Sequence, residues 1–197
     1  MENRIEEFKL QVLENPKFIE SALVTYRQNG IKKSWEVVKA HDSVAVLIYH
    51  KEHESFVLVK QFRPAVYMDG TQDGLTVELC AGIVDKSIPL VDIAKEEIIE
   101  ECGYSVDSMD ISRITMVNNA VGFAGTKQTI FYVEVDESMH THKGGGIDTE
   151  LIEVVELPIS KAKDFIYDES VAKTTGLLFS FMWWFDNYGK IMAKNKG

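Results

Sequence analysis

Three acidic residues, Glu97, Glu100 and Glu101, lie three and four positions apart in a stretch that is expected to be helical. This spacing puts the three carboxylates on one face of an α-helix. Like charges four residues apart destabilise a helix by roughly 0.2–0.5 kcal/mol per pair. A bound divalent cation removes that repulsion, because hard cations such as Mg²⁺ prefer carboxylate oxygens. The spacing therefore indicates a metal site, with a solvated acidic helix face as the alternative.

The residues around the cluster predict the helix that carries it. Pro89 suits the first turn, where its missing N–H costs nothing. Leu90, Ala94 and Ile98 recur every four residues and form one apolar stripe. Gly103 can adopt the left-handed conformation that ends a helix. The glutamates then fall near the C-terminal end, where carboxylates face the negative end of the helix dipole.

Residues 82–104 resemble the signature box of the Nudix hydrolases. That box reads Gly, five residues, Glu, seven residues, Arg-Glu, an apolar residue, any residue, Glu-Glu, any residue, Gly and an apolar residue. The positions that match at the right spacing are Gly82, Glu97, Ile98, Glu100, Glu101, Gly103 and Tyr104. Two positions depart, because Ile88 replaces the first Glu and Glu96 replaces the Arg. In the family these two residues mainly orient the helix, so the resemblance implies an intact ligand set with an altered charge balance around it.

The resemblance continues outside the box and covers most of the chain from about Thr25 onward. The segments that resemble the UDP-sugar diphosphatase branch are residues 26–30, 33–35, 41–44, 58–67, 77–82, 128–129, 131–132 and 151–155. The resemblance implies hydrolysis of a nucleoside diphosphate sugar, such as UDP-glucose, to a nucleoside monophosphate and a sugar phosphate. The alternatives are an ADP-ribose diphosphatase, or a nucleotide-binding module whose turnover is impaired by Ile88 and Glu96.

The same resemblance implies a set of metal ligands. Glu97 and Glu101 are the main ligands, Glu100 is a supporting ligand, and the carbonyl of Ala81 is an additional one. The expected cofactor is Mg²⁺, with Mn²⁺ as a second candidate. Such ions polarise the diphosphate and lower the pKa of the attacking water. Because the chain carries a net charge of −10, an anionic substrate needs these cations for binding as well as for catalysis.

Arg63 and Glu78 are the candidate substrate-binding residues. The guanidinium of Arg63 can meet phosphate oxygens with two parallel hydrogen bonds. An arginine at a strand end that pairs with a surface carboxylate is the alternative. Glu78 is a candidate acceptor for ribose or sugar hydroxyls, or else the partner of Arg63.

The resemblance also implies that the general base comes from a loop beyond the box. Three consecutive glycines, residues 144–146, are expected to make a mobile loop that closes over the substrate. Asp148 and Glu150 follow them directly, and Glu150 is the favoured base because it lies nearer the next strand and reaches further. Glu100 is the next candidate. Alternatively, both residues of the loop only keep it soluble.

Composition narrows the class of partners and the location. A net charge of −10 argues against nucleic acid, since phosphate binding draws on clustered Lys and Arg. The sequence has no run of 18 apolar residues, so no membrane span is expected. Cys80 and Cys102 are the only cysteines and form no CxxC pair, which favours free buried thiols over a disulfide. The cytoplasm is the expected location.

The order of the apolar segments predicts an α/β fold. Strands are expected at residues 43–50, 56–62, 75–81, 111–117, 129–135 and 151–155, and helices at residues 160–167 and 173–190. This alternation agrees with an α/β or α+β class. The resemblance implies, more narrowly, a Nudix-type α/β/α sandwich around a mixed sheet, occupying residues 41–197.

Residues 1–40 are expected to form an N-terminal β extension. Its predicted elements are a short amphipathic helix at residues 2–13 and strands at residues 18–28 and 31–39. Asn29 and Gly30 between the strands are a strong signal for a tight hairpin turn. Trp35 and Val37 share one strand face, and that face needs a partner. In the resembling branch this extension packs against a second subunit, which implies a homodimer; a hairpin that caps its own domain is the alternative.

Overall fold

The computed structural model describes residues 5–11, 13–70, 73–147 and 149–194. Its strands are β1 (Glu20–Gln28), β2 (Ile31–Lys39), β3 (Ser43–His50), β4 (Ser55–Phe62), β5 (Leu75–Glu78), β6 (Cys80–Ile83), β7 (Ser112–Asn119), β8 (Thr126–Val135), β9 (Ile152–Pro158) and β10 (Ala172–Lys173). Its helices are α1 (Pro64–Met68), α2 (Leu90–Cys102), α3 (Ile159–Tyr167) and α4 (Thr175–Lys194), with single 3₁₀ turns η1 (Ser108–Asp110) and η2 (Glu137–Met139). Among these helices, none is both long and apolar enough to cross a membrane.

The main sheet contains both parallel and antiparallel strand pairs. Its eight strands follow the order β10-β5-β4-β3-β8-β7, with β6 paired to β3 and β9 paired to β4. The central strand β3 runs parallel to β8 and antiparallel to β4 and β6. The expected mixed sheet is therefore present.

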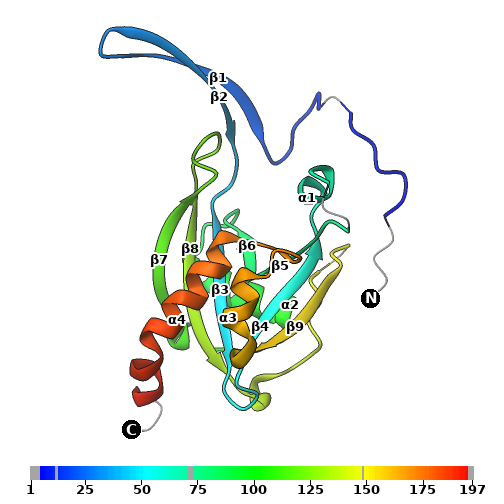
Figure 1. The fold of residues 1–197 in the computed structure, drawn as a ribbon, viewed down its shortest axis with the longest axis vertical. Coiled ribbons are helices and arrows are strands. Elements are labelled where there is room, and N and C mark those ends of the chain that lie inside the picture. The colour runs from blue at the N-terminus through cyan, green and yellow to red at the C-terminus, as the bar shows by residue number, and fades with distance from the viewer. Residues whose placement is uncertain (1–4, 12, 71–72, 148, 195–197) are drawn as a thin grey trace.

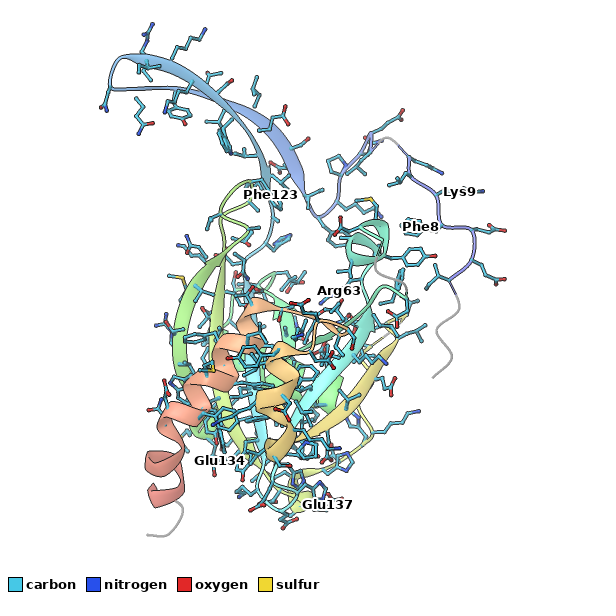
Figure 2. The ribbon with its side chains drawn as sticks, viewed as in Figure 1. Phe8, Lys9, Arg63, Phe123, Glu134 and Glu137 are labelled. Carbon is cyan, nitrogen blue, oxygen red and sulfur yellow. The ribbon has the colours of Figure 1, made fainter. Side chains whose placement is uncertain are left out.

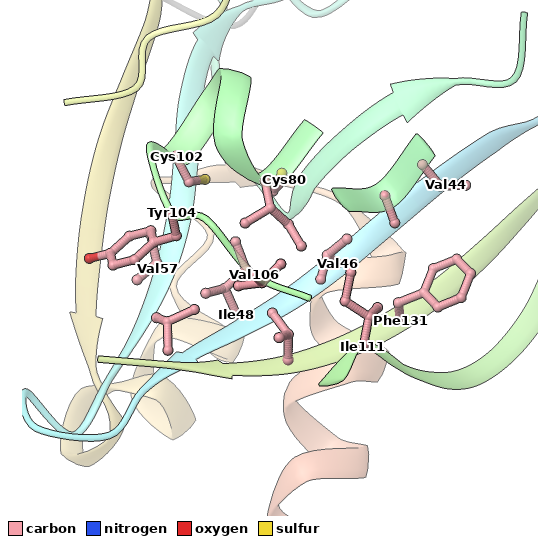
Figure 3. Close-up of a cluster of buried hydrophobic side chains, with 14 of the residues drawn as sticks. Val44, Val46, Ile48, Val57, Cys80, Cys102, Tyr104, Val106, Ile111 and Phe131 are labelled. Atoms are coloured by element: carbon pink, nitrogen blue, oxygen red, sulfur yellow. The ribbon is translucent and has the colours of Figure 1, made fainter. Parts of the chain in front are cut away.

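Helices cover both faces of this sheet (Figure 1). Side chains alternate along β3, as the two-residue period of a strand requires, so its neighbours supply two separate cores. The core on the α2 face contains Val46 together with Ile98, and part of it is drawn in Figure 3. The core on the α3 and α4 face contains Leu47 together with Trp184. The prediction of an α/β/α sandwich is confirmed.

The strands β1 and β2 form a hairpin that extends away from the main sheet as a separate ribbon (Figure 1). Asn29 has φ 53° and Gly30 has φ 81°. A two-residue turn with positive φ at both positions matches the twist of the strands that flank it. The predicted hairpin turn is therefore confirmed, and only its N-terminal strand starts later than expected, at Glu20.

Two predicted elements differ from the structure. No helix forms over the described part of residues 2–13, which is residues 5–11 and 13. A helix of about 12 residues is marginal in water without tertiary packing, and in this stretch the ring of Phe8 contacts Tyr67 from an extended chain. The single strand expected at residues 75–81 is divided into β5 and β6, because the chain changes neighbours there: β5 pairs with β4, whereas β6 pairs with β3.

Candidate active site

The carboxylate cluster lies where the C-terminal half of α2 packs against β6. Gly103 ends α2 with φ 78°, and its N–H donates to the carbonyl of Ile99. The predicted left-handed helix end is therefore confirmed. On the other side of the site, β6 is held against β3 by the register that places Ala81 opposite Ala45. The start of the box, in β6, and the end of the box, in α2, therefore lie next to each other in the fold.

Glu101 is the most enclosed carboxylate of the cluster, with 4% of the residue exposed. One of its oxygens, Oε2, accepts a 2.9 Å hydrogen bond from the backbone N–H of Ala81. Burial raises the pKa of Glu101 to about 8, although hydrogen bonds from the Ala81 N–H and the Cys80 thiol oppose that shift. Ionising a carboxylate that is buried in this way costs free energy, unless a cation lies beside it.

Glu97 lies directly against the glycine that begins the box. A Cβ atom added to Gly82 would be only 1.8 Å from Oε1 of Glu97, so this close approach requires a glycine. Burial is the main cause that raises the pKa of Glu97 to about 7, and the negative charges of Glu100 and Glu150 raise it further. The charge of Glu97 in turn raises the pKa of Glu101, so Glu97 lies near both of the other box glutamates, while their sharing of one metal ion stays a prediction.

Glu150 joins the cluster from the loop that precedes β9. Its Oε2 accepts a 3.0 Å hydrogen bond from the backbone N–H of Ile147, and its charge raises the pKa of both Glu97 and Glu101. The structure therefore brings the favoured base candidate to the box glutamates. Asp148, the second candidate, lies outside the described residues.

The glycine loop is hydrogen-bonded to the end of α2. The N–H of Gly145 donates to the carbonyl of Glu101 at 2.9 Å, and the N–H of Gly146 donates to the carbonyl of Glu100 at 3.1 Å. These bonds satisfy carbonyls that the last turn of a helix leaves without partners. A Cβ on Gly144 would lie 2.1 Å from the carbonyl oxygen of Glu101. This close approach explains why the loop has a glycine at this position. That the loop moves during a reaction stays a prediction.

Arg63 and Glu78 form a two-pronged ion pair at the end of the sheet beside α1 (Figure 2). Nε and Nη2 of Arg63 each donate a 2.7 Å hydrogen bond to one oxygen of Glu78. The hydrogen bond to Glu78 is the main cause that raises the pKa of Arg63, and the charges of Glu101 and Glu150 add to it. The guanidinium therefore faces the carboxylate cluster as well as its partner. Within the described residues its Nη1 makes no hydrogen bond.

The two departures from the box have different surroundings. Ile88 is partly exposed, at 38%. Glu96 forms an ion pair with Lys86, whose Nζ lies 2.5 Å from Oε2 of Glu96. Lys86 therefore partly offsets the negative charge that Glu96 brings to the box, while the effect of the altered charge balance on metal binding stays a prediction. Sequence reasoning missed Lys86 because it occupies one of the five positions after Gly82 that the family pattern leaves unspecified, although a lysine ten residues before Glu96 was visible in the chain.

Cys80 and Cys102 are both free and buried, and they lie in the core on the α2 face of the sheet (Figure 3). Burial raises the pKa of the Cys80 thiol, and the neighbouring Cys102 raises it further. A thiol in this state is a poor nucleophile, because the thiolate is the reactive form. The prediction of free buried thiols is confirmed.

A second group of possible ligands, His50, His53 and Glu137, lies at the far end of β3 (Figure 2 labels Glu137). The two imidazole rings are stacked, with their centroids 3.8 Å apart and their planes at 8°. An ion in the plane of one ring would therefore lie out of the plane of the other, whereas a nitrogen lone pair points within its own ring plane. Nδ1 of His50 also accepts the N–H of His53, which leaves the proton of the neutral ring on Nε2. This arrangement does not fit a metal ion, and metal binding by the box glutamates stays a prediction.

An α/β/α sandwich with a carboxylate cluster on a glycine-bounded helix is the arrangement that defines the Nudix class. No family model matches the chain. The uridine diphosphate glucose pyrophosphatase of Bos taurus is 41% identical over 188 residues, which cover 81% of this chain and 85% of that protein. The enzyme of the same name from Mus musculus is 38% identical with the same coverage, and a GDP-mannose pyrophosphatase of Cronobacter sakazakii is 35% identical over 162 residues, covering 79% and 83%. The chain belongs to the Nudix hydrolase family.

Proposed function

We propose that this protein hydrolyses the diphosphate bond of a nucleoside diphosphate sugar, releasing a nucleoside monophosphate and a sugar phosphate. The observation that carries the proposal is the meeting of Glu97, Glu101 and Glu150 beside Arg63, on a chain whose relatives are named UDP-glucose and GDP-mannose pyrophosphatases. Carboxylates and one guanidinium suit a diphosphate that is bound through metal ions.

The donor set fits Mg²⁺, and Mn²⁺ as a second candidate. All of its members offer oxygen, which hard cations prefer. Burial is the main cause that raises the pKa values of Glu97 and Glu101 to about 7 and about 8, and neighbouring carboxylates add to it, so a nearby cation would favour their ionised forms. Glu97 and Glu101 would hold the ion, with Glu100 and the carbonyl of Ala81 as additional ligands. When bound, such an ion supplies charge neutralisation of the diphosphate and a lower pKa for the attacking water.

Arg63 is proposed to orient the substrate. Glu78 occupies the Nε and Nη2 edge of the guanidinium and fixes its plane. Nη1 is then left to donate to a phosphate oxygen. Arg63 would thus serve both as the ion-pair partner of Glu78 and as a phosphate-binding residue, the two roles that the sequence suggested. A guanidinium fixed by a nearly buried carboxylate loses little freedom when the phosphate binds.

Glu150 is proposed as the general base. It would accept a proton from the attacking water while the new P–O bond forms and the bridging P–O bond breaks, and the leaving phosphate carries away the displaced electron pair. The hydrogen bond from the Ile147 N–H holds one oxygen of the carboxylate, so that the other oxygen is free to take the proton. Asp148 stays the second candidate.

The experiment is a substrate panel with purified protein and Mg²⁺. UDP-glucose, GDP-mannose and ADP-ribose are supplied separately, and the release of nucleoside monophosphate is followed. We expect turnover of UDP-glucose or GDP-mannose at a higher kcat/KM than that of ADP-ribose. A preference for ADP-ribose would favour the ADP-ribose diphosphatase alternative. Thermal stabilisation by a nucleotide without any release would favour a binding module.

We also propose that the protein is a homodimer that is assembled through the β1–β2 hairpin. Both strands are exposed along almost their whole length, and the apolar side chains they expose are Leu23, Val24, Tyr26, Ile31 and Trp35. A hairpin of two strands is marginally stable by itself in water. At its base it is fixed by two bonds, from Trp35 Nε1 to the Gly122 carbonyl and from Val38 N to the Phe123 carbonyl. The outer part of the hairpin is therefore available to contact a second copy of the chain.

The cytoplasmic location of the protein stays a prediction.

A further inference from the structure

Lys86 lies in the connection between β6 and α2, ten residues before its partner Glu96. The 2.5 Å ion pair therefore joins the connection to the middle of the helix. The start of that connection is the end of β6, where Gly82 lies against the carboxylate of Glu97. A shift of the connection relative to α2 would therefore move the backbone against which the Glu97 carboxylate lies.

Several carboxylates lie close to the ammonium group of Lys86. The hydrogen bond to Glu96 is the main cause that raises the pKa of Lys86, and the charges of Glu100 and Asp85 contribute to the same shift. In return, the positive charge of Lys86 opposes the rise in the pKa of Glu97, which burial causes in the first place. The ammonium thus acts on a carboxylate that it does not contact through a hydrogen bond.

The stability that this pair contributes is small. The side chains of Lys86 and Glu96 are 51% and 42% exposed. Ion pairs between exposed side chains typically contribute little to the stability of the fold. A protein without the pair should therefore still fold, so an effect on the site can be separated from an effect on the fold.

We propose that Lys86 is a positioning residue of the metal site. Paired with Glu96, it holds the β6–α2 connection so that Glu97 faces the ion, and its charge lessens the repulsion among the surrounding carboxylates. The inference rests on the proposed Mg²⁺ site and deepens it. It also assigns a role to Glu96, whose departure from the family pattern is matched by a cation at another position of this chain.

The test is a charge-reversal cycle of Lys86→Glu, Glu96→Lys and the double variant, with Mg²⁺ binding measured by calorimetry in the absence of substrate. Removing a group that orients a metal ligand typically weakens metal binding by about 10–100-fold, and we expect Lys86→Glu to fall in this range. The double variant should recover to within about threefold of the original protein, because the pair is restored with opposite polarity. Lys86→Met removes the charge without adding a new one and should lie in between, whereas Lys86→Arg should stay within about threefold.

Lys95→Glu is the matched control, since it makes the same charge change on α2 at a lysine that has no ion pair among the described residues. We expect it to weaken Mg²⁺ binding by less than about threefold. Equal losses for Lys86→Glu and Lys95→Glu, or no recovery in the double variant, would overturn the positioning role. If the unaltered protein itself binds no Mg²⁺, the proposed metal site fails together with this inference. If it binds Mg²⁺ and Lys86→Glu binds equally well, the inference alone fails. Thermal unfolding in EDTA verifies that each variant is folded.

Discussion

The carboxylate of Glu101 accepts a hydrogen bond of 2.9 Å from the backbone N–H of Ala81. This bond joins the end of α2 to β6, two elements that are separated by the connection of the box. The hydrogen bond fixes the position of the buried Glu101 carboxylate. It occupies one lone pair of that carboxylate but supplies no full positive charge to balance it. This bond supports the proposal that the cluster around Glu101 binds a cation.

Glu101→Gln should abolish Mg²⁺-dependent hydrolysis and leave the fold intact. The amide oxygen of glutamine can still accept the N–H of Ala81, but the negative charge that holds the ion is lost. Turnover of a nucleotide sugar and circular dichroism provide the measurement. Glu153→Gln, a change at an exposed position of β9, is the control and should have normal turnover. Near-normal turnover in folded Glu101→Gln would remove this residue from the metal site.

The metal-free protein should lose stability as the pH rises through the neutral range. The pKa values of Glu97 and Glu101 are raised from 4.5 to about 7 and about 8, so the folded state binds these two protons more tightly than the unfolded chain does. The contribution is fully present below the unfolded value of 4.5 and is lost as the pH rises through the two folded values. We expect Tm in EDTA to fall between about pH 5 and about pH 8, and to fall less when Mg²⁺ is present or in Glu101→Gln. An identical pH dependence of Tm in all three cases would contradict this assignment.

Gly82→Ala should weaken Mg²⁺ binding by about 10–100-fold, because the added methyl group displaces a metal ligand. The new Cβ would lie 1.8 Å from Oε1 of Glu97, so that side chain must move. Gly122→Ala is the matched control, since no heavy atom lies within 4 Å of the position of its Cβ. Calorimetry with Mg²⁺ compares the two variants, and equal affinities would show that Glu97 is not a ligand.

Glu150→Gln should lower turnover on the order of 10²–10⁴-fold with little change in Mg²⁺ binding, as expected for loss of a general base. Glutamine can still accept the N–H of Ile147, so the loop is expected to keep its conformation. Asp148→Asn, assayed in parallel at saturating Mg²⁺ and substrate, should lose less. If neither variant loses as much as about tenfold, the base lies elsewhere and Glu100 becomes the next candidate.

Leu23→Asp should convert the proposed dimer into a monomer. The side chain is 65% exposed on the hairpin, and a charge in an apolar interface is costly to bury. Light scattering at micromolar concentration measures the mass. Met109→Asp, which also places a charge on an exposed apolar position but on η1, should leave the dimer intact. A stable monomer of the unaltered protein would refute the dimer itself.

Much of the local structure was predictable because short-range patterns encode it. The spacing of the apolar residues and Gly103 gave the limits of α2, and Asn29 with Gly30 gave the hairpin turn. Both depend on backbone conformations that one or two residues determine. The same reasoning failed over residues 5–11 and 13, the described part of the predicted helix at residues 2–13, where an apolar periodicity is present but a helix needs a packing partner to form.

The sequence by itself determined which side chains could bind a metal, since the spacing of Glu97, Glu100 and Glu101 on a helix fixes their common face. Only the tertiary structure decided which residues from elsewhere meet them. Glu150 reaches the box because the glycine loop is hydrogen-bonded to the end of α2, and Lys86 pairs with Glu96 because the β6–α2 connection folds back along the helix. Such contacts join residues that local periodicity does not relate, so they depend on how the sheet and helices pack.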